Sequence, residues 1–186
     1  MINNIKNAAV LCTLFIVIAS NVWGQVKNQD LNLTNVLVVA QQDDLSDRYS
    51  LEVALLQLFN YYDIKSKASL NIIKEGGSPD ILVSDSIQQQ LKEEGIDTYL
   101  LVSVRGYDNR FKPSERISSL DEELKAGHLF PLYRESASRV TFTFTFYRDL
   151  EPVYSTLIRT GTVGSKEAVL KKLMKKVEKE LSRKWM

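Results

Sequence analysis

The chain has 186 residues, with 24 Lys and Arg against 23 Asp and Glu and a formal net charge of +1. This near balance argues against a nucleic-acid binder, which needs a net basic surface, so we expect no nucleic-acid partner. Apolar residues make up 44% and charged residues 25% of the chain, which is typical of a globular domain and excludes intrinsic disorder.

The first 24 residues have the pattern of a secretory signal peptide. Lys6 precedes an apolar run from Ala8 to Ala19, and Gly24 offers a small residue just before a cleavage point. The run is shorter than the ~20 apolar residues of a membrane-spanning helix. We therefore predict export, cleavage near Gly24, and a mature protein that is periplasmic or associated with the outer membrane.

Cysteine usage limits the chemistry of the mature protein. Cys12 is the only cysteine and lies inside the leader, so the mature chain has no thiol for a disulfide, a nucleophile or a metal site. The alternative is a lipid anchor at Cys12. That reading needs a small residue before the cysteine, where this chain has Leu11, and it needs the apolar run to end there.

Beyond residue 24 the pattern alternates between strands and helices. Strands are predicted from continuous or alternating apolar runs, and helices from apolar residues three and four apart. In chain order the predicted elements are a strand at 35–40, a helix at 46–62 capped by Ser46, a strand at 64–68, a helix at 81–94 with a restart near Ser84, a strand at 97–104, a short helix at 119–126, a hairpin of strands at 139–148 and 153–163, and a helix at 166–184. Residues 25–34 are predicted to be a flexible lead-in to this single domain, which spans 35–186.

The strand at 139–148 shows the clearest periodicity. Phe142, Phe144 and Phe146 share one face and alternate with threonines, which predicts one face on the core and one on water or a polar layer. Alternating strands and helices favour parallel pairing, whereas the hairpin adds antiparallel strands. We therefore predict an α/β (α+β) fold. A single mixed sheet of about five strands carries three main helices, in the order β-α-β-α-β, a long loop, then β-β-α.

The irregular segment 105–138 is the main candidate for a binding surface. An irregular stretch of this length inside a compact domain is usually functional. Aromatic and arginine side chains are the types enriched where proteins contact one another. The candidate partner-binding residues are Tyr107, Arg110, Phe111, Arg116, Phe130, Tyr133 and Arg134. The alternative is that Phe130, Leu132 and Tyr133 only anchor the segment to the core.

No catalytic constellation or cofactor motif is recognisable. The loop 41–44 after the first strand lacks the glycines that let backbone approach a phosphate. Its acids Asp43 and Asp44 suit either a hydrolytic site or the capping of the next helix. His128 is the only histidine and has no evident partner for a triad or a metal site. We predict a non-enzymatic protein without catalytic residues, metal or cofactor.

Two charge patterns on the helices predict surface features. Lys171, Lys175 and Lys179 recur every four residues on the final helix. They indicate either peripheral contact with an anionic membrane or acidic partner, or simply a solvated face. On the first helix, Arg48 and Glu52 are four residues apart and predict a surface ion pair of small energetic weight.

The order of these patterns resembles a known group of domains. An apolar strand at 36–40 leads into a helix with Arg48 to Glu52, a helix ending near Gly95 leads into the strand at 97–104, and a Phe-Thr-Phe-Tyr-Arg strand begins the hairpin. This resembles small exported bacterial envelope proteins of unknown function with a CsgG-like or TolB amino-terminal-like α/β domain. The resemblance implies a periplasmic, non-enzymatic role in envelope assembly or transport, and it carries over no functional residues.

Three functions therefore fit the sequence. The first is an adaptor or binding protein that engages another envelope protein through the segment 105–138. The second is a periplasmic carrier of a small molecule or lipid, held in an apolar cleft between sheet and helices. The third is a hydrolase that uses Asp43 or Asp44. The sequence leaves the partner and the oligomeric state open.

Overall fold

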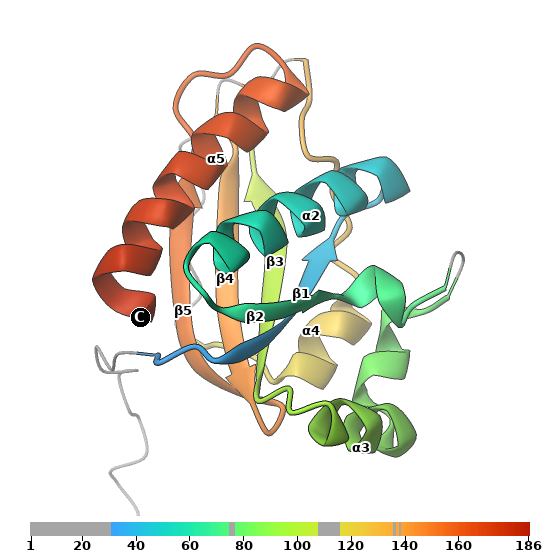
Figure 1. Ribbon diagram of the computed structural model, residues 1–186. Coiled ribbons are helices and arrows are strands. Elements are labelled where there is room, and N and C mark those ends of the chain that lie inside the picture. The colour runs from blue at the N-terminus through green and yellow to red at the C-terminus, as the bar shows by residue number, and fades with distance from the viewer. Residues whose placement is uncertain (1–30, 75–76, 108–115, 136, 138) are drawn as a thin grey trace, which may run out of the picture.

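The computed structural model describes residues 31–74, 77–107, 116–135, 137 and 139–186 (Figure 1). A five-stranded sheet in the order β2-β1-β3-β4-β5 lies between two layers of helices. The elements in chain order are β1 (Asn35–Gln41), α2 (Leu45–Tyr61), β2 (Lys65–Ala68), η1 (Ser69–Asn71), η2 (Pro79–Val83), α3 (Asp85–Glu93), β3 (Thr98–Gly106), α4 (Leu120–Ala126), β4 (Thr141–Arg148), β5 (Glu151–Arg159), α5 (Lys166–Glu180) and the π-helical turn η3 (Leu181–Trp185).

The sheet is mixed, as the sequence predicts. β1 pairs in parallel with β2 and β3, whereas β3–β4 and β4–β5 are antiparallel. The turn between β4 and β5 consists of Asp149 and Leu150, whose φ angles of 49° and 65° are left-handed, as two-residue hairpins require. The predicted fold class and the order of the main elements are confirmed, and the short helix inside the long loop is α4.

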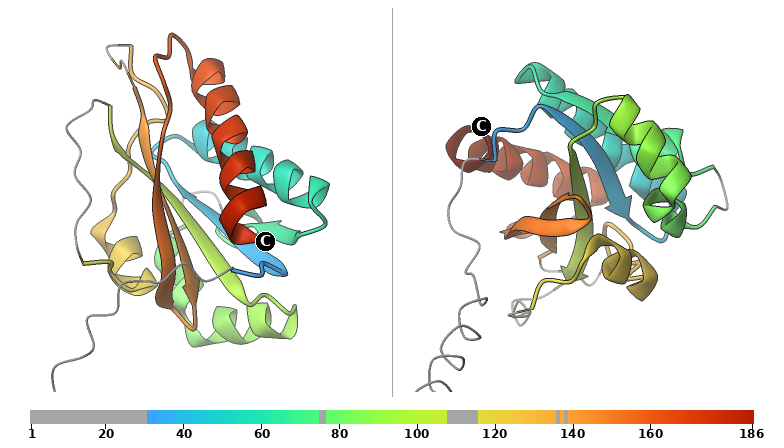
Figure 2. Two further views of the ribbon diagram at one scale, coloured as in Figure 1. Left: turned by 90° about the vertical axis from the view of Figure 1, so that its left-hand side faces the viewer. Right: turned by 90° about the horizontal axis from the view of Figure 1, so that it is seen from below.

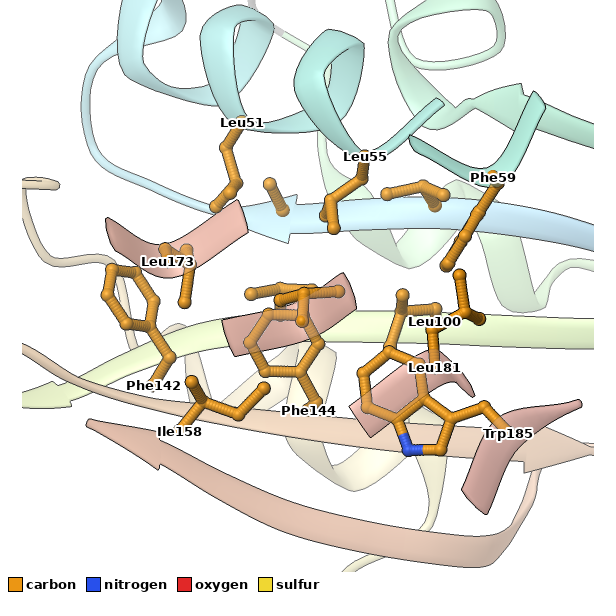
Figure 3. Close-up of a cluster of buried hydrophobic side chains, with 14 of the residues drawn as sticks. Leu51, Leu55, Phe59, Leu100, Phe142, Phe144, Ile158, Leu173, Leu181 and Trp185 are labelled. Carbon is orange, nitrogen blue, oxygen red and sulfur yellow. The ribbon is translucent and has the colours of Figure 1, made fainter. Parts of the chain in front are cut away.

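α2 and α5 lie side by side on one face of the sheet (Figures 1 and 2). Leu51, Leu55 and Phe59 of α2 point down onto this face, where they meet the inward side chains of the strands (Figure 3). Phe142 and Phe144 of β4 belong to the same cluster, so the predicted alternation of β4 does place its phenylalanines in the core. This continuous apolar layer anchors the helices whose N-termini frame the candidate site.

The end of the chain closes this core. Trp185 in η3 is fully buried and packs against Phe144 and Phe146, with ring centroids 5.8 and 4.8 Å away. Leu31 and Leu33 are buried in the same cluster, so packing against the domain begins before the predicted start at residue 35. The first thirty residues, which include the predicted leader and most of the predicted lead-in, lie outside the described residues.

The opposite face of the sheet is covered by η2, α3 and α4. Leu82, Leu91 and Leu120 from these helices pack against β1 and β3 in a second apolar cluster. Ser84 separates η2 from α3, which confirms the predicted restart of the helix. Nowhere in the residues that the structure describes is a helix both long and apolar enough to cross a membrane.

Candidate functional site

A short segment, residues 129–135, crosses the end of the sheet where β1 and β3 stop; we call it the strap. Leu132 of the strap is fully buried, while Phe130 and Tyr133 are half-buried against the α2/α5 core. Tyr107 follows β3 directly, and its hydroxyl donates a hydrogen bond to the carbonyl of Pro131. The strap is thus fastened both by apolar packing and by the residue that ends β3.

Asp47, in the first turn of α2, holds the strap from the other side. Its Oδ2 accepts a hydrogen bond of 2.9 Å from the backbone N–H of Leu132, and its Oδ1 forms an ion pair with Nζ of Lys166. The Asp47 side chain is only 2% exposed, so its carboxylate makes both contacts while shielded from solvent. The bond to Asp47 raises the pKa of Lys166. One buried carboxylate therefore joins α2, the strap and α5.

The outer side of this region combines aromatic rings with a cation. The guanidinium carbon of Arg134 lies 4.5 Å from the ring centroid of Tyr107, within the range of a cation–π contact. Burial raises the pKa of Tyr107 to about 12; the Arg134 charge opposes this rise, and the Asp43 carboxylate adds to it. Tyr107 therefore stays a neutral hydrogen-bond donor at physiological pH. We call the group Tyr107, Phe130, Tyr133 and Arg134 the strap surface.

The structure brings together four of the seven predicted partner-binding residues. Arg110 and Phe111 lie outside the described residues. Arg116 lies elsewhere: it forms an ion pair of 3.0 Å with Glu122 in the first turn of α4. The N-terminus of α4 is hydrogen-bonded to Leu150 beyond the far end of β4, whereas Tyr107 follows β3 beside the start of β4. Arg116 therefore lies apart from Tyr107, and its role in partner binding stays a prediction.

The alternative prediction, that Phe130, Leu132 and Tyr133 only anchor this segment to the core, is confirmed in part. Leu132 acts purely as an anchor, since it is fully buried. Phe130 and Tyr133 keep part of their surface accessible, and Arg134 is exposed. The same segment can therefore be anchored and still present aromatic and cationic groups outward.

Asp44 has a structural task at the start of α2. Its carboxylate accepts a hydrogen bond of 2.9 Å from the backbone N–H of Asp47, so Asp44 is the N-cap and the predicted cap, Ser46, lies inside the helix. Asp and Ser cap helices about equally well, and the apolar pattern does not distinguish them. Asp43 is exposed beside it. Among the residues with described positions, no three His, Cys, Asp or Glu side chains gather as metal ligands would.

Glu52 is the residue whose importance the sequence reasoning missed. The predicted ion pair with Arg48 is present, but Glu52 is fully buried, so the prediction that the pair lies on the surface is wrong. Its Oε1 accepts from Arg48 Nε at 3.1 Å, from Ser69 Oγ at 2.6 Å and from the N–H of Ala40 at 3.0 Å; its Oε2 accepts from the N–H of Leu70 at 3.1 Å. These four donors compensate the carboxylate for its lost hydration. Glu52 therefore fastens α2 to β1 and η1.

Neither a family model nor a curated protein sequence matches the chain. Its fold is similar to that of a PelC variant from Paraburkholderia phytofirmans, solved as a dodecamer, with 10% identity, a TM-score of 0.46, and coverage of 83% of this chain and 90% of that one. A second PelC dodecamer from the same organism gives 10% identity, a TM-score of 0.46, and coverage of 86% and 90%. Lipoprotein GNA1162 from Neisseria meningitidis gives 11% identity, a TM-score of 0.43, and coverage of 80% and 98%.

At these identities and TM-scores the likeness extends only to the coarse arrangement of strands and helices. None of these three structures is named as a CsgG-like or TolB protein, so the more specific resemblance stays a prediction.

Proposed function

We propose that the chain is an exported, non-enzymatic adaptor or binding protein of the cell envelope, which contacts a partner protein through the strap surface. The observation that carries this proposal is the convergence of Tyr107, Phe130, Tyr133 and Arg134, from two separate segments, onto one end of the sheet. Export rests on the leader pattern of the first 24 residues.

The strap surface has the chemistry of a protein contact. Tyrosine and arginine are the residue types that most often dominate binding energy at interfaces. Here Tyr107 and Arg134 already stack on each other, and the strap backbone is held by Asp47, so little conformational freedom is lost on binding. The Arg134 guanidinium presents several N–H donors, which favours a partner that offers a carboxylate beside an apolar patch.

A paired substitution tests this proposal. The double variant Tyr133→Ala, Arg134→Ala removes an aromatic ring and a cation from the strap surface. The matched control, Tyr61→Ala with Lys65→Ala, removes the same two types of group from exposed positions at the far end of α2 and the start of β2. Each tagged full-length chain is crosslinked in cells, and the envelope proteins that co-purify are quantified by mass spectrometry.

The strap variant should recover about tenfold less of the partner than the wild type, and the control should recover the wild-type amount. Thermal melting of both purified variants verifies that they are folded. Equal recovery of the same partner by the strap variant and the wild type would remove the strap surface from the proposal.

A further inference from the structure

β5 forms a long edge of the sheet, and no strand in the described part of the chain pairs with its outer side. Edge strands are usually protected from pairing by charges, prolines or bulges. In β5 these protecting features stand at the ends: Glu151, Pro152 and an adjacent shift in the register with β4 at the start, and Arg159 at the finish. The six residues between them, 153–158, are uncharged and rich in β-branched and aromatic types. This segment has the composition of a strand that accepts a neighbour.

The pairing with β4 identifies which backbone groups face outward. The N–H of Thr160 donates to the carbonyl of Val140 directly opposite, and the register then continues without a break into the middle of β5. In an antiparallel ladder, inward and outward hydrogen-bonding groups alternate from one residue to the next. Ser155, Leu157 and Arg159 therefore direct their N–H and C=O groups toward the open edge.

A basic hollow lies beside this edge, between β5 and α5. It has a volume of about 240 Å³ and is lined by Leu157, Ile158, Arg159, Lys176, Lys179, Glu180 and Arg183. The lining holds four cations and one carboxylate, and that carboxylate lies 3.7 Å from the ammonium of Lys184. Figures 1 and 2 show α5 running next to β5, and two of the cations that line the hollow, Lys176 and Lys179, belong to α5. The hollow therefore favours an anionic occupant.

We propose that β5 and this hollow accept an extended acidic segment of a partner protein, which adds a sixth strand to the sheet. The outward backbone groups of Ser155 and Leu157 pair with the added strand, as in other cases of strand addition. Side chains alternate along a strand, so carboxylates at every second position of the segment lie on the α5 side. There they meet Lys176, Lys179 and Arg183.

Charge argues against a second copy of this chain as the occupant. Two β5 strands paired antiparallel are related by a two-fold axis perpendicular to the sheet, which puts both α5 helices on the same face. The lysines and arginines of one hollow then approach those of the other, and like charges repel. An acidic segment meets the same cations with opposite charge.

Peptide binding to the mature chain tests this proposal. The probe is a fluorescein-labelled peptide of alternating valine and glutamate, compared with one of valine and lysine, by fluorescence anisotropy. The first variant, Lys176→Glu with Lys179→Glu, reverses two cations of the hollow. The matched control, Lys171→Glu with Lys175→Glu, changes the net charge equally at exposed positions of α5 outside the hollow.

The acidic peptide should bind the wild type and the control with similar affinity and bind the hollow variant about tenfold more weakly. The lysine peptide should not bind. Hydrogen exchange gives the signature of strand addition: the acidic peptide should slow exchange of the Ser155 and Leu157 amides. No binding of the acidic peptide, or binding without this protection, would overturn the proposal.

Equal loss of peptide binding in both charge-reversal variants would show a diffuse attraction to α5 and would also overturn the proposal. A membrane surface is the competing occupant, and phosphatidylglycerol–phosphatidylcholine vesicles are its probe. Vesicles that bind the wild type while the acidic peptide does not would overturn the proposal as well. The strap surface lies at a different place on the molecule, so failure at β5 leaves the function proposed above untouched.

Discussion

Two buried carboxylates on α2, Asp47 and Glu52, lie little more than one turn apart but hold different parts of the molecule. Glu52 accepts hydrogen bonds from Arg48 on its own helix and from Ser69 and Leu70, close in the chain, and from the end of β1. Asp47 instead bonds to the strap and to the first residue of α5, far along the chain. Both carboxylates are buried, but Glu52 holds together the first βαβ unit, whereas Asp47 holds together segments that are far apart in the chain.

The different partners of Glu52 and Asp47 indicate that different residues support the fold and the binding surface. Glu52 is saturated by donors inside the molecule, and none of these donors belongs to the strap surface. Asp47 lies at the end of the sheet, where the segment that it fixes presents Tyr133 and Arg134 outward. We therefore expect loss of Glu52 to affect mainly stability and loss of Asp47 to affect both stability and binding.

The largest effect should come from Glu52→Ala. Removing this carboxylate leaves the Arg48 charge, the buried N–H of Ala40 and the half-buried N–H of Leu70 without their acceptor, which should lower the free energy of unfolding by about 3–5 kcal/mol. Urea denaturation followed by circular dichroism measures the loss. Glu178→Ala, at an exposed position of α5, is the control and should change stability by less than about 0.5 kcal/mol. A smaller loss of unfolding free energy in Glu52→Ala than in Asp47→Ala would contradict the view that Glu52 is the main support of the fold.

Asp47→Ala should have a smaller effect on stability, about 1–3 kcal/mol, because Asp47 has two partners where Glu52 has four, and one of the two, Lys166, is partly exposed to solvent. Its distinctive effect should be on the strap: the amide of Leu132 loses its acceptor and should exchange its hydrogen faster. Asp44→Ala is the matched control, since it removes the N-cap of α2 at a cost of about 1 kcal/mol and leaves the strap fastened. Unchanged exchange at Leu132 in the Asp47 variant would show that the strap is held by packing alone.

Tyr107→Phe should lower stability by about 1 kcal/mol at neutral pH, because one hydrogen bond to the strap carbonyl is lost. The folded protein favours the neutral phenol, whose pKa is raised from 10.0 to about 12. Its stabilising contribution is complete below pH 10.0 and is lost as the pH rises toward about 12. Between these pH values the free energy of unfolding should fall more steeply for the wild type than for Tyr107→Phe; parallel profiles would contradict the assignment.

Lys166→Gln should have the smallest effect, below about 1 kcal/mol, because the lysine end of its pair with Asp47 is partly exposed to solvent. Its pKa is raised above 10.5, so its contribution is present below pH 10.5 and disappears as the pH rises through the folded value. Unfolding at several pH values shows this as a gap between wild type and variant that closes in alkali. A gap that widens would mean that the pair does not stabilise the fold.

Local patterns in the sequence were enough to predict most of the fold. The alternation of Phe142, Phe144 and Phe146 defines a strand with one apolar face, and the structure places these rings in the core. Ser84 interrupts the second predicted helix and lies between η2 and α3 in the structure. These features depend on neighbours in the chain, which is why they can be read without tertiary structure.

The site was less predictable because its contacts are long-range. Arg48 and Glu52 have the spacing of a surface pair, and their burial depends on Ser69 and on β1. A weak signal was present, since Glu52 lies one turn before Leu55 on the stripe that faces the core. The capping role of Asp44 and the separation of Arg116 from Tyr107 likewise depend on how distant segments are placed.

Site-specific photocrosslinking can show directly whether a partner protein contacts the strap surface. A photoreactive phenylalanine replaces Tyr133 in one chain and Tyr61, 76% exposed at the other end of α2, in a second. After irradiation of cells, the crosslinked envelope proteins are identified by mass spectrometry. We predict one dominant protein that is crosslinked from position 133 and absent from position 61. The same proteins from both positions, or none from position 133, would contradict partner contact through the strap surface.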